Sequence, residues 1–420
     1  MPNPLCKSCC HGTDVAPALN DLSIIDFPNG SLLIFINPHS GAGKGLHVFE
    51  KELKPKLLKF KIKHEIIVTE RANHAKEIIK LRNDLFDFNA IIIVSGDGLI
   101  FEVINGILER SDGEEVLKKV AFGIVPSGSG NGLLASVFHA RNLPQTLPEF
   151  ATTAYSIISD LKAQAFPINF THIETDDEHF ASFLSIGWGL LADIDIESER
   201  YRKILGGNRF VLGAFVRVFG SLRTYKGRLS FHEAGPSETI QPETFPVYNQ
   251  SNIITDQYPP SYRSHKSTID SLTSPSIKSS KQNPMLWRQH HKGEAPLLED
   301  SLPINWTVIE DEFLFVYVTS LSHISPGNLY SPSSKLFDDR IQLTYALKKD
   351  VPSKIAVMKF LDSIENGKHL EFDFCKTISV TSFRLEPLVK GSYIVVDGEI
   401  IETSKIQGTV SDLNFYVMSK

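Results

Sequence analysis

Residues 90–98 read AIIIVSGDG, an apolar run that ends directly in a glycine-rich turn. A short run of branched apolar residues bounded by turn residues is typical of a buried strand. Three similar runs lie nearby in the chain: SLLIFI at 31–36, EIIVT at 65–69 and FGIVP at 122–126. The first part of the chain therefore contains four predicted strands, most of them apolar on both faces.

Helical patterns separate these strands. Residues 45–58 carry leucine and phenylalanine at helical spacing, residues 71–82 form a second such segment, and a third has Leu99, Val103 and Ile107 on one face. Apolar strands that alternate with helices predict a parallel sheet with helices on both of its faces. Ligands of such sheets bind beyond the carboxyl ends of the strands, where the glycine-rich turns of this region fall.

The pattern changes after about residue 160 to long strand-like stretches with few helices, which predicts a mostly antiparallel β domain. Two helices are expected at 191–204 and 209–222, and residues 235–303, rich in Ser, Pro, Thr, Gln and Asn, are expected to form a disordered insertion. We thus expect a flexible tail (1–27), an α/β domain (28–160) and a larger, β-sandwich-like domain (161–420), with the active site in the cleft between the two domains. Whether the final strand, 411–418, returns to the first sheet stays open.

The composition narrows the classes of function. The formal net charge of −6 argues against a general nucleic-acid binder, which is normally basic. The chain has no apolar run of about 18 residues, so no transmembrane helix is expected, and its first residues lack the apolar core of a secretory signal. The cysteines, Cys6, Cys9, Cys10 and Cys375, form a reduced, cytosolic pattern without zinc-finger spacing. We expect a cytoplasmic protein without a zinc site.

Three glycine-rich turns follow the predicted strands, at 37–45 (NPHSGAGKG), 95–98 (SGDG) and 126–132 (PSGSGNG). Glycine lets the backbone approach an anion, and a helix that begins there presents free N–H groups to it. Three such turns at one edge of a sheet predict a polyphosphate site. The first turn lacks the pattern of a Walker A loop, the third lacks the spacing of a Rossmann fingerprint, and the H-R-D and D-F-G triplets of protein kinases do not occur.

Asp97 stands between two glycines at a strand end, where it faces the expected phosphates. An acidic group beside a polyphosphate is electrostatically costly unless it has a task, such as accepting a hydroxyl proton or holding magnesium. The structural alternative is that Asp97 caps the helix that starts at Gly98, because Asp is a favoured N-cap. The turn alone does not separate these interpretations, whereas the other two glycine loops favour the functional one.

These turns resemble the loops of the diacylglycerol kinase catalytic superfamily of lipid kinases and occur in the same order. Further along, the segment 185–202 (SIGWGLLADIDIESERYR) looks like the sphingoid-recognition segment of sphingosine kinases. Shorter segments are similar to that family as well: RFVLG at 209–213, RTYKG at 223–227, FRLEP at 383–387 and VDGE at 396–399. The resemblance covers most of the chain outside the tail and the insertion.

The resemblance implies transfer of the γ-phosphate of ATP, with Mg²⁺, to the primary hydroxyl of sphingosine, which gives sphingosine 1-phosphate. It implies that 28–160 is the ATP-binding catalytic domain and that 161–420 takes up the lipid. It makes Asp97 the catalytic base, for which an aspartate pKa near about 4 would suffice, and it makes Asp195 the contact of the amino-alcohol head group. Family nucleotide contacts correspond to Asn37, Ser40, Gly41, Thr69, Ser95, Gly96, Glu102, Gly128, Ser129, Arg202, Arg209, Asp397, Gly398 and Glu399. Asp397 or Glu399 would hold Mg²⁺ through water, and no direct metal ligand is assigned.

Asp195 bears on the choice of lipid. Sphingosine carries an ammonium beside its hydroxyl, and an aspartate at the mouth of an apolar pocket would be left unpaired by a neutral lipid. Glu199, four residues on, shares its helical face. The alternative is that this acidic run is a solvated face paired with Arg200 and Arg202. Ser185 is a further substrate-binding candidate, and the pocket wall has seven, each of which could be plain core: Phe183, Trp188, Leu191, Phe210, Leu212, Phe215 and Phe219.

Three other functions stay open at this point. A ceramide or diacylglycerol kinase would share the catalytic loops, but Asp195 argues against a neutral lipid. A soluble-substrate kinase similar to NAD kinase would share the GDG turn without needing the segment 188–202. A catalytically inactive lipid-binding scaffold would not need an intact Asp97 between its glycine loops.

The expected substrate resides in a bilayer, so we expect peripheral recruitment to membranes. Six lysines within residues 51–63 form a basic run that could meet anionic lipid, and the alternative is a solvated helix face. The oligomeric state is open, with a homodimer as one option.

Overall fold

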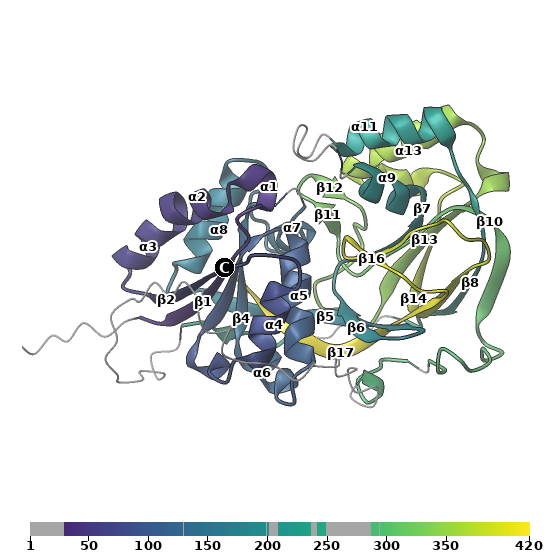
Figure 1. Cartoon of the computed structure of the whole chain (residues 1–420). Helices are drawn as coiled ribbons and strands as arrows, with labels where there is room; N and C mark the ends of the chain where they lie inside the picture. Colours follow the sequence, from purple (N-terminus) through teal and green to yellow (C-terminus); the bar gives the residue numbers. More distant parts are fainter. Residues whose placement is uncertain are drawn as a thin grey trace, which may run out of the picture.

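The structure of the chain is a computed structural model that describes residues 29–128, 130–198, 200, 209–236, 242–248, 287–293 and 295–420. The side chains of Ala42 and Arg209 lie outside this description. Figure 1 shows two halves side by side, a helix-covered half built by the first part of the chain and a sheet-rich half built by the second.

A parallel sheet forms the centre of the N-terminal half. Its strands are β1 (Ser31–Ile36), β2 (Lys63–Val68), β3 (Ala90–Ser95) and β4 (Ala121–Pro126). They lie in the order β4, β3, β1, β2, with Ile34 opposite both Ile66 and Ile92. The branched apolar side chains of β1, β3 and β4 are buried on both faces, whereas β2 at the edge is partly exposed. Burial on both faces is what the apolar runs of the sequence require.

Helices cover both faces of this sheet. Figure 1 shows α2, α3 and α8 on one side of the strands and α4, α5 and α6 on the other. Helices α1, α5 and α7 begin just beyond β1, β3 and β4, so their N-termini lie at one edge of the sheet. The bounds are α1 Ser40–Gly43, α2 Gly45–Val48, a π-helical turn Phe49–Leu53, α3 Lys54–Lys59, α4 His74–Leu81, a 3-10 turn Leu85–Asp87, α5 Asp97–Leu108, α6 Gly113–Lys119, α7 Gly132–Ala140 and α8 Glu149–Ile158.

The C-terminal half is mostly antiparallel. Its strands lie in the order β16, β15, β7, β10, β13, β14, β17. The long strands β10 and β14 each pair with β13 along one part and with β8 along another, so the sheet folds back on itself in the manner of a sandwich. The bounds are β5 Gln164–Thr175, β6 His179–Ser182, β7 Ser185–Gly189, β8 Tyr225–Glu233, β10 Thr307–Thr319, β11 His323–Ser325, β12 Asn328–Leu329, β13 Ile341–Leu347, β14 Lys376–Pro387, β15 Ile394–Val396, β16 Glu399–Ile401 and β17 Ile406–Ser419.

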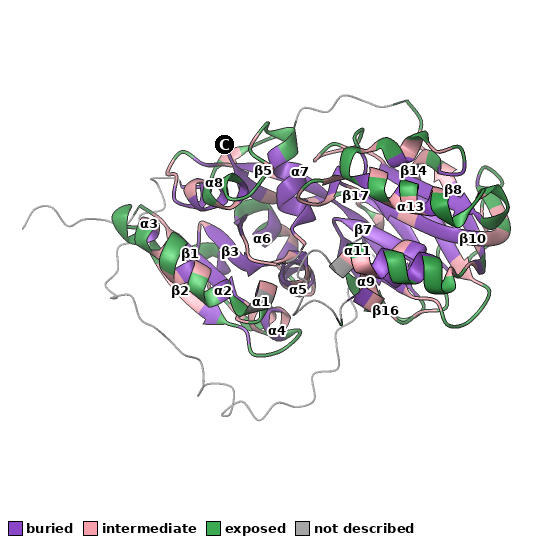
Figure 2. Cartoon of the chain, turned by 90° about the horizontal axis from the view of Figure 1, so that it is seen from above, coloured by how far each residue is buried: buried purple, intermediate pink, exposed green. Residues whose placement is uncertain are grey.

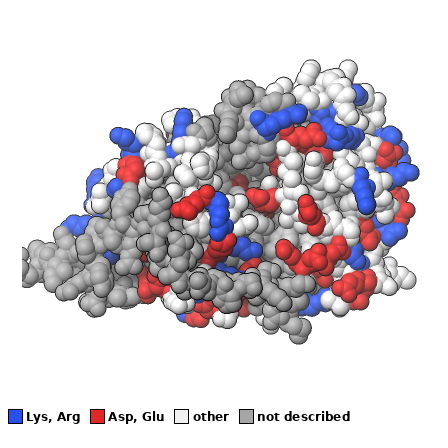
Figure 3. Space-filling view, viewed as in Figure 1, with Lys and Arg blue, Asp and Glu red and all other residues white. Residues whose placement is uncertain are grey.

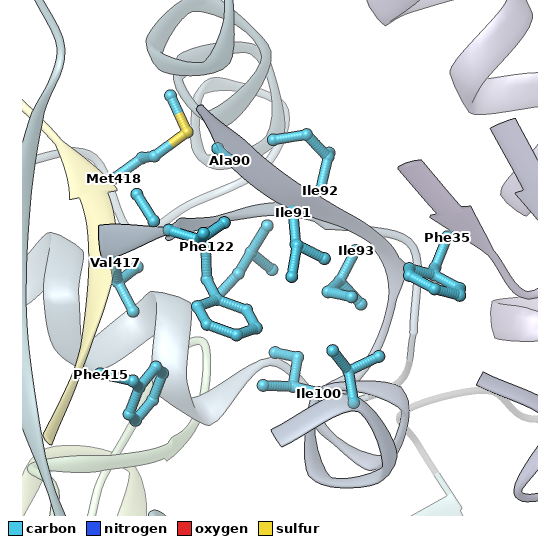
Figure 4. Close-up of a cluster of buried hydrophobic side chains, with 14 of the residues drawn as sticks. Phe35, Ala90, Ile91, Ile92, Ile93, Ile100, Phe122, Phe415, Val417 and Met418 are labelled. Carbon is cyan, nitrogen blue, oxygen red and sulfur yellow. The ribbon is translucent and has the colours of Figure 1, made fainter. Parts of the chain in front are cut away.

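The last strand joins the two halves. Strand β17 is antiparallel to β14 and β5, and near its end it pairs in parallel with β4, with Val417 opposite Phe122. Figure 4 shows Phe122, Ile91, Ile100 and Phe415 gathered in one cluster, and the rings of Phe122 and Phe415 meet edge-on at 5.5 Å between centroids. Burying a side chain of this size stabilises the fold by about 1.5–3 kcal/mol. The final strand therefore does return to the first sheet, which the sequence left open.

Three helices lie together at one end of the C-terminal half, as Figure 1 shows. They are α9 (Leu190–Ser198), α11 (Arg209–Phe215), which continues into a π-helical turn Val216–Gly220, and α13 (Lys354–Asp362). Helix α13 was not anticipated, and it is followed by 3-10 turns Ser363–Asn366 and Lys368–Glu371; a further one spans Lys348–Asp350. Figure 2 shows that α11 and α13 each keep an exposed outer side. Within the described ranges, none of the helices combines the length and the apolar character needed to cross a bilayer.

Two parts of the segment 235–303 pack against the rest of the chain, so a disordered insertion over that whole range is wrong for these parts. Strand β9 (Phe245–Pro246) pairs with β5, and Val247 and Tyr248 are buried. Trp287 is fully buried and stacks on His172 at 4.7 Å between ring centroids. Large aromatic residues that stand alone in a polar stretch, such as Tyr248 and Trp287, are the feature of the sequence from which these two contacts could have been predicted. Residues 237–241, 249–286 and 294 lie outside the description.

The predicted fold class is confirmed. An α/β half with a parallel sheet and helices on both faces precedes a larger, mostly antiparallel half. The predicted helix at 191–204 is present as far as Ser198, and residues 199 and 201–204 lie outside the description.

Candidate active site

A cavity of about 670 Å³ lies between the two halves. The N-terminal half contributes the glycine turns after β1 and β3, part of the turn after β4, and the residues that follow β2. The C-terminal half contributes side chains of β7, β10, β15, α9, α11 and α13. The cavity therefore lies at the carboxyl ends of the parallel strands, the edge at which the sequence predicted a ligand.

The three glycine turns meet backbone to backbone. A Cβ atom added at Gly128 would lie 2.5 Å from the Cα of Gly96, and one added at Gly41, where φ is +47°, would overlap the carbonyl oxygen of Ser127. No side chain fits at either position without moving the neighbouring turn. The turns thus form one surface of closely approaching main chain, which suits a polyphosphate held by N–H groups.

Polar side chains of the turns lie around the same point. The hydroxyls of Ser95 and Ser127 donate to the Oγ of Ser40, at 3.5 and 3.3 Å. Asn37 accepts a hydrogen bond from the backbone N–H of His39 at 2.9 Å, which shapes the first turn. Thr69 follows β2, is buried, and its hydroxyl lies 3.4 Å from the carbonyl oxygen of Ile36. These residues come from the ends of all four parallel strands.

Asp97 is the first residue of α5, and its carboxylate is buried. Its Oδ2 accepts the N–H of Gly132 at 2.8 Å and its Oδ1 accepts the N–H of Leu133 at 3.3 Å. The side chain therefore binds the N-terminus of α7 and does not cap a helix that starts at Gly98, which was the structural alternative. Each oxygen retains a further lone pair, so the carboxylate is fixed in direction and still able to accept a proton.

The environment of Asp97 changes its acidity. Burial raises the pKa of this carboxyl to about 6, against the N–H groups of Gly132 and Leu133, and the negative charge of Asp397 acts in the same direction as burial. The pKa of Asp97 thus lies above the ordinary value near about 4 that would suffice for this role. A base with a pKa near the working pH is well suited to general base catalysis.

Asp397 is a structural residue at the wall of the cavity. It occupies the turn between β15 and β16 with a φ of +50°, and its carboxylate accepts hydrogen bonds from the Ser182 hydroxyl (2.8 Å) and from the N–H groups of Phe183, Leu184 and Ser185 (2.9, 3.0 and 2.9 Å). Burial raises its pKa to about 6 despite these bonds. Asp397 therefore fixes the turn that precedes β7 instead of presenting a free carboxylate to a metal ion.

Three further nucleotide candidates line the cavity near α5. Glu399 is exposed, and its Oε1 lies near Gly98, 3.1 Å from where a Cβ would stand. Gly398 has a φ of +89°, which the turn requires. Burial raises the pKa of Glu102, and hydrogen bonds from backbone N–H groups at the start of α4 counteract this rise. Its Oε2 has no hydrogen-bond partner among the described residues. Glu102 thus orders the turn between β2 and α4.

Some candidate residues lie outside the description, and one contact was missed. Ser129, Arg202 and the side chain of Arg209 are not described. Arg71, in the turn after β2, lines the cavity and forms a bond of 2.8 Å to Glu77. The rule that residues just beyond parallel strands form the site would have identified Arg71.

The predicted head-group residues divide between cavity and core. Asp195, Ser185 and Leu191 line the cavity. Trp188 does not, because it is fully buried among the side chains of the folded sheet and its indole N–H donates to Ser392 at 2.8 Å. Trp188 is therefore corrected from a substrate contact to a core residue.

The apolar wall also differs from the prediction. Of the predicted residues, Leu191 and Phe210 line the cavity, Phe183 belongs to the core, Leu212 is half-buried away from the lining, and Phe215 and Phe219 face outward. The sequence missed the contributions of Ala214, Tyr317, Ile324, Met358, Leu361 and Ile364. Several of these come from α13 and from β10 and β11, far along the chain.

The acidic run of α9 has two faces. Asp193 is buried, accepts the hydroxyl of Tyr225 at 2.8 Å and pairs with Arg217 at 2.7 Å. Glu197 pairs with the same arginine at 2.8 Å. Asp195 lies on the other side and lines the cavity. The run is therefore not one solvated face; Glu199 and Arg202 lie outside the described residues.

The cavity has two parts that suit different chemical groups. One part offers converging main chain and hydroxyls for phosphates beside a buried carboxylate of raised pKa. The other part is apolar, with the carboxylate of Asp195 among its lining. Within the described ranges, no group of three or more His, Cys, Asp or Glu side chains is arranged to hold a metal ion.

Comparison with known proteins identifies close relatives. The model of the diacylglycerol kinase catalytic domain matches residues 31–164. Sphingosine kinase 1 of Caenorhabditis elegans is 39% identical over 383 residues, which cover 90% of this chain and 79% of that protein. Sphingosine kinase 1 of Homo sapiens is 30% identical over 392 residues, which cover 92% of this chain and 90% of that protein.

A solved structure shares the fold. The crystal structure of a diacylglycerol kinase from Bacillus anthracis strain Sterne superposes with a TM-score of 0.51, at 15% identity, over 94% of this chain and 98% of that one. At this level of identity the likeness concerns the fold alone.

Proposed function

The chain belongs to the sphingosine kinase family, and from this premise we propose that it transfers the γ-phosphate of ATP to the primary hydroxyl of sphingosine. The product is sphingosine 1-phosphate. The observation that carries the proposal is one cavity lined both by three converging glycine turns with Asp97 and by an apolar wall with Asp195.

The transfer step assigns one task to Asp97. The hydroxyl oxygen of the lipid bonds to the γ-phosphorus while the bond between this phosphorus and the β–γ bridging oxygen breaks, and ADP leaves. The hydroxyl proton passes to the Asp97 carboxylate. Because the N–H groups of Gly132 and Leu133 fix that carboxylate, it can orient the hydroxyl for in-line attack.

The turns hold the phosphates while this happens. Main-chain N–H groups around Gly41, Gly96 and Gly128, with the hydroxyls of Ser40 and Ser95, offer donors to the phosphate oxygens. When bound with ATP, Mg²⁺ neutralises charge on the β- and γ-phosphate oxygens. Carboxylate oxygen suits this ion, and Glu399, whose Oε1 lies near Gly98 in the cavity lining, would hold it through water. Asp397 is engaged by four hydrogen bonds within the fold.

The kinase assay tests this function directly. Purified protein is given labelled ATP, Mg²⁺ and, separately, sphingosine, ceramide or diacylglycerol in detergent micelles. We expect phosphorylation of sphingosine in preference to both neutral lipids. Transfer to a neutral lipid alone would leave a lipid kinase and discard the role of Asp195, and transfer to none of the three would overturn the function.

Replacing Asp195 with asparagine should weaken use of sphingosine specifically. An ammonium held by a carboxylate in an apolar cavity loses its charge-assisted bond when the partner becomes neutral, which lowers kcat/KM for sphingosine by about 10- to 100-fold. The KM for ATP should not change. The matched control is Glu197→Gln, two residues along the same helix, which pairs with Arg217 outside the cavity lining. Equal losses in the two variants would contradict the head-group role.

Peripheral contact with membranes is the second part of the proposal, and the outer face of α11 and its π-helical turn supports it. Val211, Phe215 and Phe219 are 71%, 56% and 45% exposed and follow one another at intervals of four residues. Phe210, Val211 and Ala214 of the same helix line the cavity, so the row begins at the cavity itself. An exposed apolar row beside a lipid cavity suits contact with acyl chains.

The lysine run of residues 51–63 supports membrane contact less well. Lys54 pairs with Glu50 at 2.8 Å, as expected of an ordinary solvated helix face. Acidic and basic side chains are also interspersed over the face shown in Figure 3. The apolar row is therefore the better candidate for the contact.

Changing Phe215 and Phe219 together to serine should lower binding to phosphatidylcholine vesicles by about 10-fold or more, because each phenyl ring loses roughly 1.5–3 kcal/mol of burial in the bilayer. Sedimentation of the protein with vesicles measures this. Activity on sphingosine in micelles is the control and should stay near that of the wild type. Unchanged vesicle binding at low and high salt would contradict the contact through this row.

A further inference from the structure

Tyr317 lies near the end of β10 and lines the cavity, and its ring is tightly placed. It lies opposite Gly187 of β7, where an added Cβ would stand 3.2 Å from two ring atoms of Tyr317. On its other side the ring of Tyr330 packs at 4.7 Å between centroids. The position of the phenol is therefore set by the absence of a side chain at residue 187 and by a neighbouring aromatic ring.

The residues around Tyr317 fix its backbone as well. The Tyr330 hydroxyl bonds the hydroxyl of Thr344 at 2.6 Å, and Thr344 donates to the carbonyl oxygen of Tyr317 at 2.9 Å. Tyr330 is fully buried and is not part of the cavity lining, whereas Tyr317 is. Of the two adjacent phenols, Tyr317 is the one that a substrate can touch.

The phenol of Tyr317 lies among the polar groups of the lipid side of the cavity. Burial raises its pKa well above the ordinary value, a hydrogen bond with the Ser185 side chain opposes this, and the charges of Asp195 and Asp397 act with burial. The group is therefore a neutral hydroxyl at working pH. A phenol can donate one hydrogen bond and accept others, so the bond with Ser185 leaves it capacity for a ligand.

The proposed substrate offers three polar groups on adjacent carbons. The primary hydroxyl must reach the phosphate and Asp97, and the ammonium on the next carbon suits Asp195. The secondary hydroxyl follows on the third carbon, and it needs a partner in this largely apolar part of the cavity, because an unpaired buried hydroxyl is costly. Ser185, Asp195 and Tyr317 are near one another and line the cavity. Ser185 and Tyr317 both carry neutral hydroxyls, and the phenol of Tyr317 extends further from its backbone than the hydroxyl of Ser185.

We propose that Tyr317 is a specificity-determining residue that hydrogen-bonds the secondary hydroxyl of the sphingoid base. This inference rests on the proposed function and adds a residue to it. It predicts that the protein distinguishes a 2-amino-1,3-diol from an otherwise identical amino alcohol that lacks the secondary hydroxyl. A site built to bond a hydroxyl discriminates strongly against the analogue without it.

The test compares two substrates in three proteins. The substrates are sphinganine and its analogue without the secondary hydroxyl, both of which keep the primary hydroxyl and the ammonium. The proteins are the wild type, Tyr317→Phe, which removes one oxygen and keeps the ring, and Tyr330→Phe as the matched control. The measured quantity is the ratio of kcat/KM for sphinganine to kcat/KM for the analogue.

We expect the wild type to prefer sphinganine, and Tyr317→Phe to lose about 10- to 100-fold in kcat/KM for sphinganine but little for the analogue, so that the ratio collapses. Tyr330→Phe should keep the wild-type ratio even if it unfolds at a lower temperature. An unchanged ratio in Tyr317→Phe, or equal losses for both substrates, would overturn the inference while leaving the kinase activity intact. A wild type that phosphorylates neither substrate would overturn the proposed function and the inference with it.

Discussion

Replacing Asp97 with asparagine should lower kcat/KM for sphingosine by about 10²- to 10⁴-fold, the range that a general base contributes. The amide of asparagine keeps the size of the side chain but cannot take the hydroxyl proton. Its oxygen can still accept the N–H of Gly132, which helps to keep the start of α7 in place, although the bond to Leu133 is lost because the amide nitrogen cannot accept it. Phosphorylation of sphingosine with labelled ATP measures the effect.

The control for this variant is nucleotide binding. Because Asp97 acts on the hydroxyl and not on the phosphates, the asparagine variant should bind ATP about as tightly as the wild type. The wild type should also lose activity as the pH falls through about 6, since burial raises the pKa of Asp97 to about 6 and the protonated form cannot accept a proton. An asparagine variant with more than a tenth of wild-type activity would contradict the role of Asp97 as base.

The meeting of the glycine turns could be predicted from the sequence because each turn is a local feature. Each glycine turn directly follows a strand, and parallel strands bring their carboxyl ends to one edge. The turns at Gly41, Gly96 and Gly128 therefore had to meet once the sheet was recognised. The resemblance to sphingosine kinases rested on the same turns and on the segment 185–202, and it is confirmed by relatives that match nearly the whole chain.

Some errors came from ignoring periodicity that the sequence contains. Ser185 and Gly187 line the cavity, whereas Ile186 and Trp188 point into the folded sheet. This is the two-residue alternation of a strand, which would have assigned Trp188 to the core. Helical periodicity would have separated two other candidates in the same way, since Phe210 of α11 lines the cavity whereas Phe215 on another side of this helix is exposed.

Other parts of the site could not be read from local sequence. Tyr317 and Met358 reach the cavity only because β10 pairs with β7 and because α13 packs near α11. These are contacts between segments far apart in the chain. The pairing of Val417 with Phe122 is of the same kind: the apolar pattern of the last strand predicted a strand but did not say which neighbour it would choose. The raised pKa of Asp97 also depends on burial by both halves.

The meeting of the three turns leaves no room for a side chain at Gly128. Its Cα faces Gly96 so closely that an alanine Cβ would lie 2.5 Å from the Cα and 2.7 Å from the N of Gly96. Both obstacles are backbone atoms, which cannot rotate away as a side chain could. Gly128→Ala must therefore push the second turn away from the third, and Asp97 directly follows the displaced residue.

We expect Gly128→Ala to weaken ATP binding by about 100-fold or more, since misplacing a binding group by about 1 Å can cost that much, and to lower the free energy of unfolding by about 1–3 kcal/mol as overpacking does. Titration calorimetry with ATP and thermal unfolding measure the two effects. The matched control is Gly235→Ala, because nothing lies within 4 Å of a Cβ at that position, and it should behave as the wild type. A Gly128→Ala protein that binds ATP normally would show that the phosphates are held without close contact between these turns, and the polyphosphate site would then have to be sought elsewhere in the cavity.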